Sequence, residues 1–376
     1  MTSLSFSQIS DMNTHGIWIL RESILTPTSV DSALTYAAES GFNKVFIQVR
    51  SRGDALYTSD IVVNHPRIEP SFDPLSYAIE LGHEMKLEIH AWMNMYVLWS
   101  SKIKPVNTEH IYYTRHEWTE ANHHGKMDWR IDISRPPSPN WEGIFLSPIH
   151  PQVNYYLRSV VKEVITEYNV DGIHLDYIRY QDDFYGFNPL GRELFKEIYE
   201  VDPLDIERGI ISTRFGWEQS FADSMVKTWE SFKRNKVTEL VQFIRTDMME
   251  SGKNMMLSVA VKSNLDIAQN RYFQDWPSWL KMNLVDFIIP MNYHVKISNF
   301  TQDIGLIKAT VLPENIDRIV MGISTYNQNV ESVIDKILTT YGNGFSGICI
   351  YSYDSHKNNL DWFYPILNTI QKPVRN

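Results

Sequence analysis

The chain has 376 residues, of which 43% are apolar and 21% charged, so a large hydrophobic core can form and a disordered or collagen-like chain is excluded. The formal net charge is −10 and no basic run offsets it, which argues against nucleic acid and anionic membranes as partners. The only cysteine is Cys349, so neither an intrachain disulfide nor a cysteine-based zinc site can form.

Targeting and membrane segments are not evident in the sequence. No apolar stretch approaches the roughly 20 residues that a membrane-spanning helix requires. Residues 1–13 lack the basic and apolar regions of a signal peptide, so we expect a cytoplasmic protein or an exported protein whose signal has been removed.

Eight short runs rich in β-branched and aromatic residues are predicted to form strands, and most are followed by a segment with helical spacing. In chain order they cover residues 16–20, 44–50, 86–94, 170–178, 255–262, 285–292, 318–324 and 346–352. Eight alternating units close a (β/α)8 barrel, which takes roughly 250 residues plus insertions. We therefore predict an α/β fold, a (β/α)8 TIM barrel, as a single domain over residues 1–376.

Two of the connecting helices are well marked. Apolar residues between Val30 and Ala38 recur at spacings of three and four, and the pattern stops at Gly41, a typical C-terminal cap. The same spacing runs from Val153 to Tyr168, with Pro151 in the expected first turn.

Long insertions are expected after the third and fourth strands, at about residues 95–149 and 180–225, where such barrels carry their function. Both are rich in aromatic residues, namely Trp99, Tyr112, Tyr113, Trp118, Trp129 and Trp141 in the first and Phe184, Tyr185, Phe187 and Trp217 in the second. These side chains could stack on sugar rings or pack the insertions onto the barrel, and the sequence favours neither interpretation.

Side chains along a strand alternate between the helices and the barrel axis, which separates core residues from site residues. In the third strand Ile89, Ala91 and Met93 are predicted to face the helices. The inward set is then His90, Trp92 and Asn94 from the third strand, Gln48 and Arg50 from the second, His174 and Asp176 from the fourth, and Lys262 from the fifth. Polar residues from several strand ends therefore converge on one site.

Asp176 is the strongest catalytic candidate, because it ends a strand and places a carboxylate where it can attack or stabilise an oxocarbenium-like centre. The structural alternative is an ion pair with Arg179 or Lys262. Hydrolysis of a glycosidic bond needs a second carboxyl group. The candidates lie just beyond strand ends and are Glu22, Asp54 and Asp354, with Asp182 and Asp183 behind them.

Cationic and aromatic residues near the same strand ends are predicted to bind the substrate. Arg50, Arg52 and Lys262 would contact hydroxyl, carboxylate or lactyl groups, and structural ion pairs are an equally weighted alternative. The other predicted contacts are His90, Trp92, Asn94, His174, Arg179, Asn292, Tyr293, Tyr326 and Tyr351. Of these, His174 lies one layer below Asp176 and is expected to orient its neighbours by hydrogen bonding.

Five motifs, taken in order, resemble glycosyl-hydrolase-like family 10. The fourth strand reads Asp171-Gly172-Ile173-His174-Leu175-Asp176-Tyr177, and residues 48–57 (QVRSRGDALY) and 90–94 (HAWMN) are similar to the second and third strands of the family. Gly16-Ile17-Trp18 and Pro290-Met291-Asn292-Tyr293 resemble the first and sixth strands. The matches run from Gly16 to about Tyr353. The resemblance implies a barrel glycosidase, in a family that includes members acting on the glycan strands of peptidoglycan.

The chain departs from related signatures at two positions. Many members of the family have a second Asp directly after the one matching Asp176, and here that residue is Tyr177. The signature also resembles family-18 chitinases, whose fourth strand ends in a Glu acid where this chain has Ile178. Substrate-assisted hydrolysis with that acid is therefore disfavoured, although residues 291–293 resemble the chitinase sixth strand and keep an N-acetyl sugar among the candidates.

The prediction is a glycoside hydrolase that acts on a polysaccharide or oligosaccharide without a metal or cofactor. A carbohydrate-binding barrel that has lost catalysis is the main alternative, because a fold does not guarantee chemistry. A metal-dependent hydrolase is disfavoured, since His90 and His174 lie on separate strands and the pair His123-His124 lacks helical spacing. The sugar, the linkage, the stereochemistry and the oligomeric state are left open.

Overall fold

Eight parallel strands form a closed barrel in the computed structural model, which describes residues 14–139, 141–210 and 218–371. The strand order around the barrel is β1-β10-β9-β8-β7-β6-β3-β2. The strands are β1 (Thr14–Ile19), β2 (Lys44–Arg50), β3 (Glu88–Asn94), β6 (Gly172–Asp176), β7 (Met256–Lys262), β8 (Phe287–Met291), β9 (Val320–Ser324) and β10 (Gly347–Tyr351). Each coincides with a predicted strand, so the predicted (β/α)8 barrel is confirmed.

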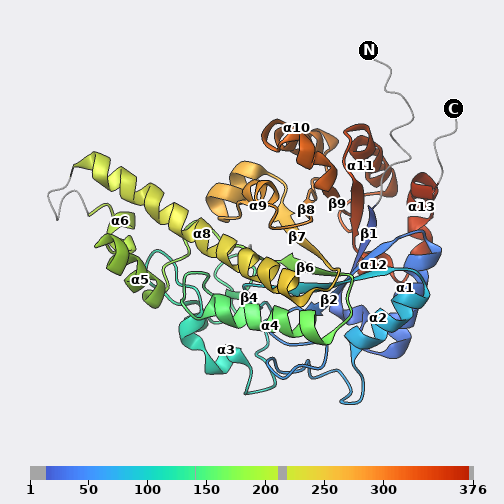
Figure 1. The fold of residues 1–376 in the computed structure, drawn as a ribbon, viewed down its shortest axis with the longest axis horizontal. Helices are drawn as coiled ribbons and strands as arrows, with labels where there is room; N and C mark the ends of the chain where they lie inside the picture. The colour runs from blue at the N-terminus through green and yellow to red at the C-terminus, as the bar shows by residue number, and fades with distance from the viewer. Residues whose placement is uncertain (1–13, 140, 211–217, 372–376) are drawn as a thin grey trace, which may run out of the picture.

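Helices surround the barrel, and the longest of them reaches well beyond it (Figure 1). They are α1 (Pro27–Glu39), α2 (Pro74–Glu84), α3 (Ile111–Thr114), α4 (Val153–Glu167), α5 (Pro189–Tyr199), α6 (Pro203–Glu207), α8 (Gln219–Ser251), α9 (Trp276–Lys281), α10 (Ile297–Thr310), α11 (Val330–Gly342), α12 (Tyr353–His356) and α13 (Tyr364–Gln371). Short helical turns are η2 (Arg21–Ser23), η3 (His116–Trp118), η4 (Asp128–Arg130), η5 (Ile267–Arg271), η6 (Pro313–Arg318) and η7 (Leu360–Phe363). No helix in the described ranges combines the length and apolar character needed to cross a bilayer.

Local sequence explains where these helices begin and end. Thr26 and Ser29 form a capping box at the start of α1, and Gly41 follows its end with a φ of 77°, as a C-terminal glycine should. Helix α4 begins at Val153, so Pro151 lies in the turn that precedes it, not in its first turn.

The barrel has an outer core beneath the helices and an inner core on its axis. Ile89, Ala91 and Met93 belong to the outer core, as the alternation of β3 predicts. The inner core consists of Trp18, Phe46, Trp92, Phe287, Ile289, Val320 and Cys349. Next to this inner core, position 172 must be glycine, because a Cβ atom there would lie 2.1 Å from the ring of His90.

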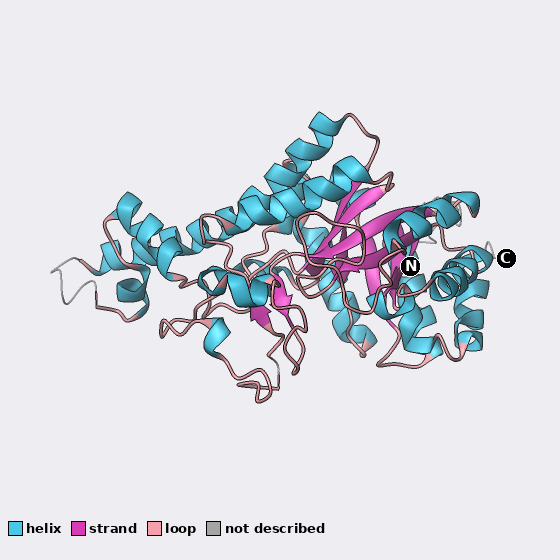
Figure 2. Cartoon of the chain, turned by 90° about the horizontal axis from the view of Figure 1, so that it is seen from below, coloured by secondary structure: helices cyan, strands magenta, loops and turns pink. Residues whose placement is uncertain are grey.

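The first insertion lies between β3 and α4 and contains a small sheet of its own. Strand β4 (Val97–Trp99) pairs antiparallel with β5 (Ile144–Phe145), and Figure 2 shows this pair apart from the barrel strands. The second insertion contains α5, α6 and the beginning of α8.

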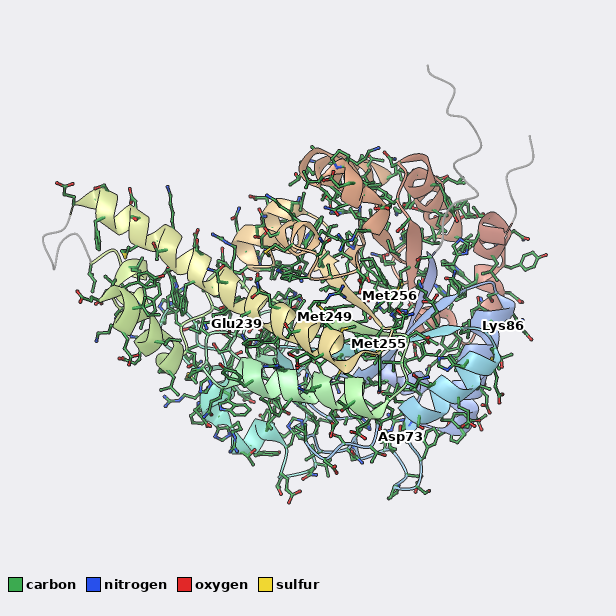
Figure 3. The ribbon with its side chains drawn as sticks, in the orientation of Figure 1. Asp73, Lys86, Glu239, Met249, Met255 and Met256 are labelled. Atoms are coloured by element: carbon green, nitrogen blue, oxygen red, sulfur yellow. The ribbon has the colours of Figure 1, made fainter. Side chains whose placement is uncertain are left out.

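Helix α8 lies along α4, which anchors it to the barrel. Asn154 donates to Glu239 at 3.0 Å, and Arg158 makes a bidentate ion pair with Asp247 at 2.7 and 2.8 Å. Figure 3 labels Glu239 and Met249 along α8, above α4, and Met255 and Met256 where the chain enters β7.

The aromatic residues of the two insertions mainly pack the insertions against the outer core. Trp99, Tyr112, Trp118, Tyr185 and Phe187 are buried in the outer core or beside it, while Trp129 and Phe184 are exposed. Tyr113 and Trp141 are partly buried against the same core, and Trp217 lies outside the described residues. Packing, not sugar stacking, is therefore the role that these contacts support.

Candidate functional site

A cleft of about 1020 Å³ opens where the barrel strands end. Its walls come from residues at the ends of the barrel strands, together with residues of the first insertion and of η5. The predicted site residues that line it are Glu22, Arg52, Trp92, Asn94, Asp176, Arg179, Lys262, Tyr293, Tyr326, Tyr351 and Asp354. Residues from distant parts of the sequence thus meet at one place, as the strand-end argument predicts.

Arg50 does not reach the cleft, and its predicted inward orientation is wrong. The pairing of β2 with β3 shifts register between Gln48 and Arg50, so Arg50 lies opposite the outward residue Met93. Its guanidinium is fully buried and donates to the carbonyl oxygens of Asn94 and Met95. The irregularity breaks the strict alternation on which the prediction rested.

His90 and His174 face the barrel axis as predicted but lie beneath the cleft. Both are fully buried, and their rings lie 4.9 Å and 4.6 Å from the ring of Phe46. His174 accepts a hydrogen bond from the indole of Trp18 at 3.1 Å and contacts the Ser258 hydroxyl at 2.9 Å. Burial lowers the pKa of His174 well below its usual value, so the ring is neutral.

Asn292 and Asp54 also lie outside the cleft lining. The Asn292 amide is fully buried and donates to the carbonyl oxygen of Phe300 at 3.0 Å. Asp54 accepts from the backbone N–H of Arg52 at 3.2 Å and lies 3.9 Å from His65.

Asp176 ends β6 and lies beside Asn94 of β3 at the floor of the cleft. Only 7% of its surface is exposed, and one carboxylate oxygen accepts the backbone N–H of Tyr177 at 2.6 Å. Burial raises the pKa of Asp176 to about 6, against the opposing effect of nearby positive charge. The carboxyl group therefore exchanges its proton close to neutral pH.

A second carboxyl group, which sequence reasoning missed, lies in the same cleft. Glu142 precedes β5 in the first insertion and forms a 2.6 Å ion pair with Arg179. Burial would raise the pKa of Glu142, but the positive charges of Arg179 and Lys262 outweigh burial and lower it. No motif marks Glu142, because a loop residue outside the barrel strands enters the cleft only through tertiary contacts.

Two cations hold Glu142 in place, and both cations lie against aromatic rings. Arg179 is 3% exposed and lies over the rings of Tyr177 and Tyr272 at 4.8 and 4.6 Å. Lys262 lies 4.0 Å from Glu142 and 4.7 Å from the Tyr272 ring centroid. In the described part of the chain, both cations pair with Glu142 and neither pairs with Asp176, so the ion pair considered as the structural alternative for Asp176 is not formed.

The other carboxylates proposed from sequence are held by neighbouring groups. Asp354 accepts from the backbone N–H of Leu20 at 2.7 Å and from the Ser23 hydroxyl at 2.6 Å. Glu22 is paired with Arg21 at 3.1 Å and Arg67 at 2.6 Å. Asp182 accepts hydrogen bonds from Nε and one terminal nitrogen of Arg271, and neither Asp182 nor Asp183 lines the cleft.

A cluster of aromatic rings also lines the cleft. Tyr293 and Tyr351 are stacked with centroids 5.4 Å apart, and Tyr326, which is 59% exposed, meets both rings edge-on. Trp18 and Trp92 form the floor next to Tyr351. Such flat apolar faces beside polar groups suit sugar rings.

Comparison with known proteins fits this geometry. A family model described as "Glycosyl hydrolase-like 10" matches residues 14–339. The chain belongs to this family. Its members are glycoside hydrolase-like proteins, and the resemblance seen in the strand motifs is confirmed.

Two proteins of similar sequence are called glycosyl hydrolases. Glycosyl hydrolase DigH of Escherichia coli (strain K12) is 24% identical over 319 residues, which cover 80% of this chain and 66% of that protein. Glycosyl hydrolase YngK of Bacillus subtilis (strain 168) is 24% identical over 161 residues, or 41% of this chain and 27% of that protein. This chain thus spans less than two thirds of the length of either relative.

Among solved structures, the PgaB (BpsB) glycoside hydrolase domain from Bordetella bronchiseptica has a TM-score of 0.69 at 11% sequence identity. The match covers 96% of this chain and 99% of the PgaB chain. The catalytic domain of β-amylase from Paenibacillus polymyxa has a TM-score of 0.62 at 11% identity, with coverage of 96% and 99%. These similarities show that the glycosyl hydrolase-like 10 chain shares its fold with glycoside hydrolases.

Proposed function

We propose that this glycosyl hydrolase-like 10 chain hydrolyses O-glycosidic bonds within a glycan, with Asp176 and Glu142 as its two carboxyl groups. The observation that carries the proposal is the presence in one cleft of two carboxyl groups whose pKa values are shifted in opposite directions. A glycosidase needs one carboxyl group that holds a proton and another that is ionised at the same pH.

The environments of the two residues suggest their roles. Asp176 keeps its proton up to a pH of about 6, because its burial outweighs the nearby cations, and it is the proton donor to the leaving oxygen. Glu142 is ionised, because Arg179 and Lys262 stabilise its charge. As the anomeric C–O bond breaks, the Glu142 carboxylate faces the developing positive charge and accepts a proton from the water that adds to the anomeric carbon.

The cleft wall supports a sugar substrate. Tyr293, Tyr326 and Tyr351 line the same cleft as the carboxyl groups and would contact a sugar ring, and Asn94 and Lys262 would supply polar contacts to hydroxyl groups. The names of the relatives DigH and YngK, both called glycosyl hydrolases, point to the same reaction class.

The test is release of reducing ends from a panel of neutral, acidic and amino-sugar glycans, including peptidoglycan strands without stem peptides. Asp176→Asn is compared with Asp317→Asn, a matched change of an exposed carboxyl group in η6, which precedes β9 and so lies at the other end of the barrel. We expect Asp176→Asn to lower kcat by at least about 1000-fold and the control to retain wild-type activity. Equal activity of the two variants would refute the assignment. Binding without release on any glycan would favour the carbohydrate-binding barrel.

A further inference from the structure

The short strand that follows Glu142 is held along both of its edges. On one edge β5 pairs with β4, where Phe145 lies opposite Val97. On the other edge the Phe145 N–H donates to the carboxyl oxygen Oδ2 of Asp128 at 3.1 Å, and the Phe145 carbonyl oxygen accepts the backbone N–H of Glu120 at 2.8 Å. The Asp128 carboxyl group therefore takes the place that a carbonyl oxygen of a further strand would occupy.

Asp128 is itself fixed inside the first insertion. It is fully buried in η4, and its backbone N–H donates to the Glu120 carbonyl oxygen at 2.8 Å. Burial raises the pKa of Asp128 well above its usual value, and the nearby Glu120 carboxyl group raises it further against the opposing charge of Lys126. Neither Asp128 nor Glu120 lines the cleft, so neither side chain contacts a substrate there.

Phe145 connects this support to the candidate site. Its ring lies 5.9 Å from the guanidinium carbon of Arg179 and 6.0 Å from the ring of Tyr177. Glu142, three residues earlier in the chain, pairs with the same Arg179 at 2.6 Å. Between them Gly143 passes so close to β4 that a Cβ atom there would lie 2.5 Å from a backbone oxygen of that strand. The chain from Phe145 back to Glu142 has little room to adjust, so a shift of β5 moves Glu142 relative to Arg179.

We propose that Asp128 is a positioning residue for Glu142, because its carboxyl group holds β5 in place and so fixes the ion pair of Glu142 with Arg179. The inference rests on the proposed function, in which Glu142 is one of the two carboxyl groups of the reaction. Without the Asp128 acceptor the buried N–H of Phe145 has no partner, and a movement of β5 relieves that cost. A displacement of about 1 Å at a reacting group is enough to lower a rate by up to about 100-fold.

The test compares substitutions that remove the acceptor with one that keeps it. Asp128→Leu removes it, whereas Asp128→Asn retains an amide oxygen that can accept the same N–H. Asp132→Leu is the matched control, since Asp132 lies in the same insertion, is exposed and accepts hydrogen bonds from Ser134. Each change is made in the wild-type chain and in Glu142→Gln, and kcat and KM are measured on a glycan that the wild type cleaves. Crystal structures of both Asp128 variants give the distance between Glu142 and Arg179 without any turnover.

We expect Asp128→Leu to lower kcat about ten-fold to fifty-fold and to change KM less than about two-fold. In the Glu142→Gln chain the same substitution should lower kcat less than about three-fold, because residues that act as a unit are not additive. Asp128→Asn and Asp132→Leu should stay within about two-fold of their parent chains. The ion pair of Glu142 with Arg179 should be broken in the crystal structure of Asp128→Leu and kept in that of Asp128→Asn.

An equal loss of kcat in both backgrounds would mean that Asp128 supports the fold alone and would overturn the proposal, as would an unchanged ion pair in Asp128→Leu. If Asp128→Leu does not fold, Asp128→Ser, which has a shorter side chain, replaces it, and a failure of both to fold gives the same negative result. A wild type that releases no reducing ends would refute the glycosidase, while the crystal structures still report whether Asp128 places Glu142.

Discussion

On β3 and β6, the polar residues that face the barrel axis form two layers. The deep layer is buried in the barrel, and the outer layer lines the cleft. His90 and His174 occupy the deep layer, where both rings are fully buried against Phe46. Asn94 and Asp176 lie further along the same strands and open onto the cleft. Facing the barrel axis is therefore not enough to make a site residue, because the height along the strand decides whether the side chain meets substrate or core.

The two layers also differ in the state of their ionisable groups. Burial lowers the pKa of His174, so that its ring is neutral and bonded to Trp18 and Ser258. Burial raises the pKa of Asp176 to about 6, which leaves it able to exchange a proton. The deep layer is expected to contribute stability and the outer layer chemistry.

After Asp176→Asn, the largest effect is expected from Glu142→Gln, which also tests the outer layer. We expect kcat to fall about 100-fold, because the ionised partner is lost. The pKa of Asp176 should also fall, since Glu142 helps to raise it and Arg179 and Lys262 would be left unopposed. A pH profile of kcat then shows the loss of activity above about pH 6 moving to lower pH. An unchanged profile with a lower kcat would indicate a purely structural role for Glu142.

The deep layer is tested by His174→Leu. The substitution leaves the buried Trp18 indole N–H without its partner, which costs about 1–3 kcal/mol, and removes one of the two contacts of the Ser258 hydroxyl, which keeps the Ile173 carbonyl oxygen at 3.5 Å. We expect urea unfolding to show a loss of about 2–5 kcal/mol, with kcat changed less than about ten-fold in the folded protein. A loss of kcat as large as that of Asp176→Asn, without a loss of stability, would contradict the division between layers.

Asp176→Asn should stabilise the protein near neutral pH. The folded pKa of Asp176, about 6, is above its ordinary value of 3.8, so the stability linked to its proton is fully present below about pH 4 and is lost as the pH rises through 6. Asparagine does not ionise and avoids this loss. The expected gain is about 1–3 kcal/mol at pH 7.5 and close to zero at pH 4, measured by thermal or denaturant unfolding at both pH values. A gain that does not depend on pH would exclude ionisation of Asp176 as its cause.

The smallest effect concerns the aromatic residues of cleft and insertion. Tyr326 lines the cleft and is 59% exposed, whereas Trp129 is 38% exposed in the insertion and stacks on His116. We expect Tyr326→Ala to raise KM by about five-fold to ten-fold, from one lost stacking contact, and Trp129→Ala to leave KM unchanged. A larger rise in KM for Trp129→Ala than for Tyr326→Ala would mean that the insertion binds the sugar.

The sequence by itself determined the eight strands, the outward and inward residues of β3, and Asp176 at the end of β6, because spacing and alternation are local properties. The family also followed from short motifs within those strands. The alternation rule failed at Arg50, where the change of register between β2 and β3 turned the side chain away from the cleft.

The tertiary structure alone decided the second carboxyl group and the cations that surround it. Glu142 lies in a loop without periodicity, and its place depends on the ion pair with Arg179, which follows a different strand. Such contacts form between residues far apart in the sequence, and the folded arrangement of strands and loops brings them together.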